Sequence, residues 1–192
     1  MLSIARLMRC VGRRRRVSLD ERGVSAIEFA LIAPLMVALY FGAIELSQGI
    51  AIDRKVTLTA RTVTDLVAQA TKLNQTEMDG LLAAAAAIIA PYPEKVGTTA
   101  KLRLTVSQIK IDAQRNATID WSVTKNGSVR TTVGTLPDAF RVADTYLIWG
   151  VAEYDYNPGF ASNFVATWHG AVTLRDQIYM RARQQSSVQY TP

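Results

Sequence analysis

The chain has 192 residues, of which 49% are hydrophobic, and its formal net charge is +6. This length allows one domain and an anchor, and the apolar fraction is too low for a protein with several membrane spans. Residues 1–23 hold seven arginines and two acids, which leaves 15 of the 22 basic and 14 of the 16 acidic residues in 24–192. The positive charge is therefore a property of the N-terminal leader. The remainder carries no basic stripe, so we expect no nucleic-acid partner.

Residues 24–44 form an apolar run of membrane length. Twenty-one helical residues at ~1.5 Å each extend ~31 Å, about the thickness of one hydrocarbon core. Four consecutive arginines, Arg13–Arg16, precede the run. The positive-inside rule then predicts a cytoplasmic leader over 1–23, a transmembrane helix over 24–44 and an extracytoplasmic remainder. A buried core helix and a cleaved secretory signal peptide are the alternatives, although a signal peptide has a shorter apolar region.

Glu28 is the one charged residue within this run. A charge in hydrocarbon costs at least ~2.5 kcal/mol on insertion scales, so the chain must gain something by keeping it. A cut between Gly23 and Val24 would create an α-amino group, largely protonated at neutral pH, four residues before Glu28. Residues four apart share a helix face. Pairing of this ammonium with the carboxylate, within one chain or between neighbours, reduces the desolvation cost, and pairing between chains also fixes their axial register.

The string Gly23-Val-Ser-Ala-Ile-Glu28-Phe29 resembles the processing motif of type IV-like prepilins, in which a glycine precedes the cut and a glutamate is fifth after it. The longer string, which continues as Ala-Leu-Ile-Ala-Pro34, is similar to TadE-like proteins, the minor pseudopilins of the tight-adherence (Tad/Flp) pilus system. The segment Val151–Pro158 also resembles the aromatic–proline segment of that family. The tail departs from the family, because Met180-Arg-Ala-Arg183 stands where members often have Pro-Arg.

The resemblance implies cleavage between Gly23 and Val24 by a membrane prepilin peptidase, for which this chain is a substrate. It implies a role in adherence-pilus biogenesis at the bacterial inner membrane, with a periplasmic C-terminal domain and with membrane lipid and other pilins, pseudopilins and assembly proteins as partners. Glu28 and Phe29 would serve subunit register and assembly. The implied protein is not an enzyme and needs no cofactor and no metal. The sequence leaves open whether it enters the filament or primes its assembly.

Pro34 lies ten residues after Val24, inside the apolar run. Proline removes one helical hydrogen bond and can kink the helix. A bend that assists packing between subunits is one interpretation. A proline that the membrane helix merely tolerates is the other.

Two helical patterns follow from the residues after the run. Apolar residues recur at helical spacing from Ile44 to Thr71, which predicts an amphipathic continuation of the anchor to about residue 71. A second helix is predicted from Thr76, whose side chain can cap it with Asp79 three residues later. Pro91 ends it. This second helix is too short to span a membrane and is expected to lie on a sheet.

Strand patterns dominate from Thr99 onward. Apolar residues alternate over 102–106 and change parity before Ile109, which indicates a bulge or turn near Ser107. A clean alternation over 117–124 predicts the next strand.

The C-terminal half completes the predicted domain. Asn126-Gly127 predicts a hairpin turn, with a returning strand through Val129, Thr131 and Val133. Residues 145–156 form a long apolar strand, and a last strand or helix covers about 171–183. The fold class is therefore α+β. A long N-terminal helix precedes a small domain over 72–192, in which one or two helices pack on an antiparallel sheet.

Few residues are candidates for chemistry. His169 is the single histidine, and no nucleophile motif accompanies it, so we read it as an ordinary histidine. Glu153 and Asp155 share a strand face, where a cation site is one reading and a solvated polar face the favoured one.

Aromatic residues gather near the end of the long strand. Tyr154 and Tyr156 share one face, Trp149 lies on the other, and Phe160 follows. Core packing is the favoured role, and a partner interface is the alternative.

Two functions remain as hypotheses. The first is a pilus subunit or assembly protein cut after Gly23. The second is a periplasmic binding module or enzyme that an uncut helix tethers to the membrane. Replacement of Glu28 separates them, because only the first requires the carboxylate.

Overall fold

The computed structural model describes residues 21–159 and 172–192. Within them the chain forms two compact units, one that ends at Phe41 and one from Gly42 to Pro192. The fold class is confirmed as α+β, with a long N-terminal helix followed by a small domain of helix and antiparallel sheet. The elements are α1 (Glu21–Gln69), β1 (Lys72–Asn74), α2 (Gln75–Ala86), η1 (Ala87–Ile89), β2 (Lys95–Val96), β3 (Thr99–Ala100), β4 (Leu102–Ile111), β5 (Ala117–Lys125), η2 (Asp138–Phe140), β6 (Thr145–Tyr156), β7 (Val172–Met180) and β8 (Gln189–Thr191).

The main sheet has four antiparallel strands in the order β5-β4-β6-β7. The register of β4 against β5 shifts between Gln108 and Ile109, so the parity change in the sequence does mark a bulge. The long strand over 145–156 is confirmed as β6, and the last predicted element is a strand, β7.

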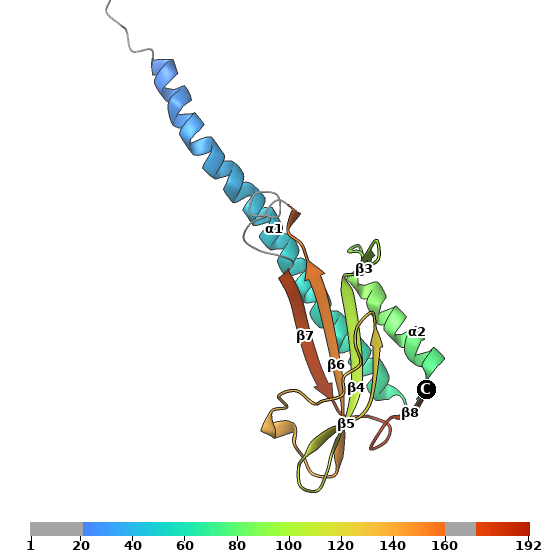
Figure 1. Ribbon diagram of the computed structural model, residues 1–192. Helices are drawn as coiled ribbons and strands as arrows, with labels where there is room; N and C mark the ends of the chain where they lie inside the picture. The colour runs from blue at the N-terminus through green and yellow to red at the C-terminus, as the bar shows by residue number, and fades with distance from the viewer. Residues whose placement is uncertain (1–20, 160–171) are drawn as a thin grey trace, which may run out of the picture. The chain divides into compact units, whose positions relative to one another are not determined.

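The C-terminal part of α1 and α2 pack together against one face of this sheet (Figure 1). Apolar side chains spaced along α1 supply this core, among them Ile52, Val56 and Val63, which are buried. At its crossing with β6 the helix approaches Gly150 closely. A β-carbon there would lie 3.1 Å from Thr64 Cβ and 3.3 Å from the carbonyl oxygen of Ala60. The absence of a side chain at Gly150 therefore sets how closely helix and sheet pack.

The start of α2 differs from the prediction. Its N-cap is Asn74, not Thr76: the Asn74 side chain accepts from the Glu77 N–H at 2.8 Å, and the Glu77 carboxylate accepts from the Asn74 N–H at 2.9 Å. A capping box with the longer Glu side chain thus replaces the predicted Thr–Asp pair. At the other end α2 stops at Ala86 and one 3₁₀ turn follows.

The predicted hairpin at Asn126-Gly127 is wrong. No strand forms over residues 128–133, and β5 pairs along one edge with β4. Asn126 takes the positive φ that such a turn uses, at 60°. The chain then crosses the other face of the sheet, where the Arg130 N–H donates to Ser122 Oγ at 3.0 Å and Leu136 is buried. Burial of apolar residues on that face stabilises this path of the chain, in place of the backbone hydrogen bonds that a return strand would have made with β5.

The C-terminal segment is tied down by a network that the sequence analysis missed. The buried Gln108 side chain accepts from the Val188 N–H and donates to Asp120, both at 2.7 Å. The Trp121 indole donates to the Val188 carbonyl at 3.0 Å. These bonds hold β8 beside β1 as a parallel pair. Isolated three-residue strands carry no sequence pattern that predicts them.

Candidate functional site

The predicted processing and assembly residues lie in the first turns of α1. Gly23, Val24, Glu28, Phe29 and Pro34 are all helical, and Pro34 is inside the helix. The side chains of Val24 and Phe29 are 47% and 68% exposed, and Glu28 is exposed as well. A β-carbon at Gly23 would meet nothing within 4 Å. None of these positions is therefore chosen for packing within the described chain.

The side chains of the apolar run are not covered by other described parts of the chain. Among the residues that the structure describes, one helix, Gly23–Gln69, is long and apolar enough to cross a membrane by length and composition, with mean hydropathy 2.1 in its most apolar window and none of that window buried. Leu31 and Leu35 are 76% and 61% exposed. A continuous apolar surface of this kind marks contact with lipid or with another protein.

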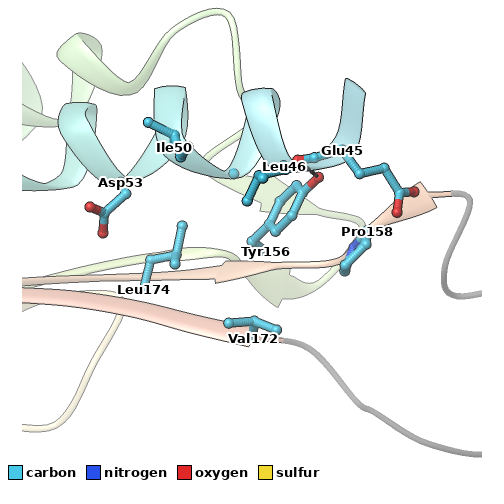
Figure 2. A pocket seen from close by; sticks show the side chains of 9 residues that line it. Glu45, Leu46, Ile50, Asp53, Tyr156, Pro158, Val172 and Leu174 are labelled. Atoms are coloured by element: carbon cyan, nitrogen blue, oxygen red, sulfur yellow. Dashed lines mark hydrogen bonds between the residues drawn. The ribbon is translucent and has the colours of Figure 1, made fainter. Parts of the chain in front are cut away.

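An apolar groove of about 490 Å³ lies on the second unit, between α1 and the ends of β6 and β7 (Figure 2). Figure 2 shows the Tyr156 ring directed from β6 toward Leu46 of α1, with Val172 and Leu174 of β7 beside it. The Tyr156 hydroxyl donates to the Glu45 carbonyl at 3.4 Å. Burial raises the pKa of this tyrosine. The predicted aromatic–proline segment therefore packs on the turns of α1 that follow the apolar run.

Glu153 and Asp155 do share a face, and arginine occupies the place considered for a cation. Arg103 donates to both oxygens of Asp155, at 2.6 and 3.0 Å, and to Glu153 at 3.3 Å. Glu153 Oε1 also lies 3.4 Å from Arg175 and 3.7 Å from Arg130. The hydrogen bonds from Arg103 lower the pKa of the Asp155 carboxyl. In turn, the carboxylates of Asp155 and Glu153 raise the pKa of Arg103. No cluster of metal-ligating side chains occurs among the described residues.

The sequence did not reveal these arginines as a group. Arg103, Arg130 and Arg175 are 27 to 72 residues apart in the chain. The register Arg103↔Glu153↔Arg175 across β4, β6 and β7 brings two of them together, and Arg130 reaches Glu153 from the segment after β5. Strand alternation predicts which face each side chain takes but not which residues stand opposite each other.

The aromatic residues occupy opposite faces, as predicted. Tyr154, 4% exposed, packs in the core beneath the helices, and its hydroxyl donates to the Pro93 carbonyl at 3.3 Å. Trp149, 2% exposed, belongs to a second apolar cluster on the other face. Core packing is thus confirmed for both. Phe160 and His169 lie outside the described residues.

The comparison with protein families identifies one segment. The model of the family described as TadE-like protein matches residues 23–65, the segment that contains Gly23, Glu28 and Pro34. The match confirms the resemblance to the TadE-like family. No curated protein and no solved structure matches the chain.

Proposed function

We propose that the chain is a prepilin-like minor subunit or assembly protein of a Tad-type pilus, cut after Gly23 by a prepilin peptidase and active in adherence-pilus biogenesis. The observation that carries the proposal is the combination of Gly23 and Glu28 at the start of an exposed apolar helix, within the segment that the TadE-like model matches. The role is structural rather than enzymatic.

The proposed placement follows from the charge on each side of the helix. The arginine-rich residues 1–23 stay in the cytoplasm, residues 24–44 cross the bacterial inner membrane, and the domain over 72–192 lies in the periplasm. The helix supports this placement by its length and composition.

The proposed cut lies close to Glu21, where the described part of α1 starts. Gly23 favours local opening of the backbone there, because glycine disfavours the helix. The leader can then be presented to a peptidase without disturbing the domain.

The cut would give Glu28 its charge partner. Among the described residues no ion pair includes Glu28, and its nearest candidate partner would be the new ammonium of Val24, one helical turn away. We propose that Glu28 pairs with the Val24 ammonium of a neighbouring chain, with Phe29 packing beside it and Pro34 bending the helix, so that the pair sets the register between subunits.

The test is the N-terminus of the mature protein, measured by intact mass after purification from membranes of cells with an active prepilin peptidase. We expect a chain that starts at Val24. Gly23→Val should abolish the cut, whereas Gly42→Val, in the same helix and equally free of close contacts at the β-carbon, should leave it intact. A wild-type chain that still starts at Met1 would refute the proposal.

The same strains report the role of Glu28. We expect Glu28→Ala to remain in the membrane and to abolish piliation, and Asp53→Asn, an exposed acid further along α1, to have no effect. Full piliation with Glu28→Ala would favour a tethered binding module, in which the helix is only an anchor.

A further inference from the structure

A cavity of about 530 Å³ lies on the face of the sheet opposite the helices, and neither the anchor nor the cut explains it. Trp149 and Tyr179, stacked with ring centroids 5.7 Å apart, contribute aromatic surface to its lining. Arg130 and Arg175 also line it, together with the acidic residue Asp176 and the neutral residues Thr135 and Gln177. The cavity therefore combines aromatic surface with two guanidinium groups.

Two residues that line this cavity each have a buried donor without an acceptor. The indole Nε1 of Trp149 and the Nε of Arg130 are both inaccessible to solvent, and neither has a hydrogen-bond partner among the described residues. Trp149 as a whole is 2% exposed. Buried donors are nearly always satisfied, because an unsatisfied one costs ~1–3 kcal/mol. The site is short of an acceptor.

The charges show the same shortage. Arg103 is matched by its two-oxygen contact with Asp155. Glu153 Oε1 is then the ion-pair partner of both Arg130, at 3.7 Å, and Arg175, at 3.4 Å. Both distances exceed those of a strong charged hydrogen bond. Three guanidinium groups thus face two carboxylates, with the unmatched charge beside the cavity.

A third acidic residue, Asp176, contributes to the lining of the cavity but forms no ion pair with its arginines. Asp176 follows Arg175 along β7 and stands opposite Ala152 of β6, whereas Arg175 stands opposite Glu153. Asp176 Oδ1 accepts from the Gln177 N–H at 2.8 Å, and within the described ranges no ion pair joins it to either arginine.

Arg130 is held ready for a ligand. Its guanidinium carbon lies 4.6 Å from the centroid of the Trp149 ring, and its own backbone N–H is fixed on Ser122. Stacking on an aromatic face leaves the edges of a guanidinium group free to donate. A pre-positioned group loses little entropy on binding.

We propose that this cavity binds the carboxylate of an Asp or Glu side chain from a partner protein, with Arg130 and Arg175 as its charge partners. Within the ion-paired cluster, three guanidinium groups meet the two carboxylates of Glu153 and Asp155, so one further negative charge balances it, and Asp176 in the lining disfavours a more highly charged phosphate. The Trp, Tyr and Arg lining is typical of the residues that dominate protein interfaces. The site does not depend on cleavage after Gly23.

The experiment uses the full chain in a neutral detergent, with the indole N–H groups observed by ¹⁵N NMR. The probe is a terminally blocked peptide with two adjacent glutamates, and its glutamine counterpart is the matched control. We expect the glutamate peptide to shift the Trp149 signal saturably and to leave the Trp121 signal unmoved, because that indole already donates to Val188. The glutamine peptide should have no effect.

Variants assign the effect to the two arginines. Arg175→Gln, at a half-exposed position, should weaken the peptide at least about tenfold without loss of the folded spectrum, and Arg130→Lys should weaken it while keeping the charge. Arg54→Gln, on the exposed side of α1, should change nothing. Equal responses to both peptides, an unmoved Trp149 signal, unchanged binding by Arg175→Gln, or tighter binding of inorganic phosphate would each overturn the proposal.

Discussion

Both halves of α1 carry apolar side chains, yet the halves differ in what covers those side chains. In residues 24–44 the side chains are exposed almost throughout, and Leu39 is 65% exposed. In the second half Val56, Val63 and Val67 are completely buried against the sheet. The sequence distinguishes the halves, because residues 24–44 hold one charged residue and residues 45–69 hold six. A helix that is apolar all round needs cover on every side, whereas one apolar stripe needs a single sheet.

Charged groups repeat this contrast. Asp155 in the domain receives two hydrogen bonds from Arg103 and one from Thr173. Glu28 in the apolar run forms no ion pair within the described part of the chain. Asp155 thus has its charge partner within the domain. The apolar run leaves both its surface and its charge to be satisfied from outside, as expected of a segment whose partners are lipid and other subunits.

The largest expected effect tests the two halves directly. Ile52→Ala removes a side chain that is 2% exposed, so we expect the free energy of unfolding of the domain to fall by ~2–5 kcal/mol. Ile32→Ala, at 53% exposure, should leave it unchanged. Urea unfolding of the detergent-solubilised chain, followed by tryptophan fluorescence, measures both. Similar losses in the two variants would show that the halves do not differ as described.

The second prediction concerns the ion pair between Arg103 and Asp155. The pKa of Asp155 is lowered by Arg103, so the pair contributes stability above the ordinary carboxyl pKa and loses it as pH falls through the lowered, folded-state value. We expect Arg103→Met to cost ~1–3 kcal/mol at pH 7. The difference in the free energy of unfolding between variant and wild type should shrink as the pH falls below about 4, because Asp155 then becomes protonated in the unfolded chain.

Urea midpoints measured from pH 7 to pH 3 give this difference. Lys110→Met is the control, since that lysine is exposed on the same strand. A gap between Arg103→Met and wild type that stays constant over the whole range would rule out Asp155 as the source of the stability.

Regular patterns made much of the fold predictable. The long apolar stretch over 145–156 coincides with β6, and the parity change before Ile109 marks the bulge. The processing motif in the first turns of α1 was visible because its residues are adjacent in sequence. Local signals of this kind need no knowledge of the fold.

Features that depend on competition or on register were not predictable. Asn126-Gly127 has the composition of a hairpin turn, but burial of Leu136 on the far face of the sheet takes the chain elsewhere. The arginines that meet Glu153 come from β4, β7 and the segment after β5, so no spacing in the sequence connects them. Tertiary packing decided both.

The smallest expected effect tests the helix start that the sequence misplaced. In α2 the unsatisfied N–H groups are bonded by the domain's own side chains, with Asn74 and Glu77 capping each other. Asn74→Ala should therefore lower the free energy of unfolding by ~1 kcal/mol, whereas Thr76→Ala, at an exposed position inside the helix, should change it by less than ~0.5 kcal/mol. Urea unfolding of the two variants separates them. A larger loss from Thr76→Ala would move the start of α2 to the residue that sequence alone favours, and the first turn of the helix would then depend on hydroxyl capping rather than on the reciprocal box.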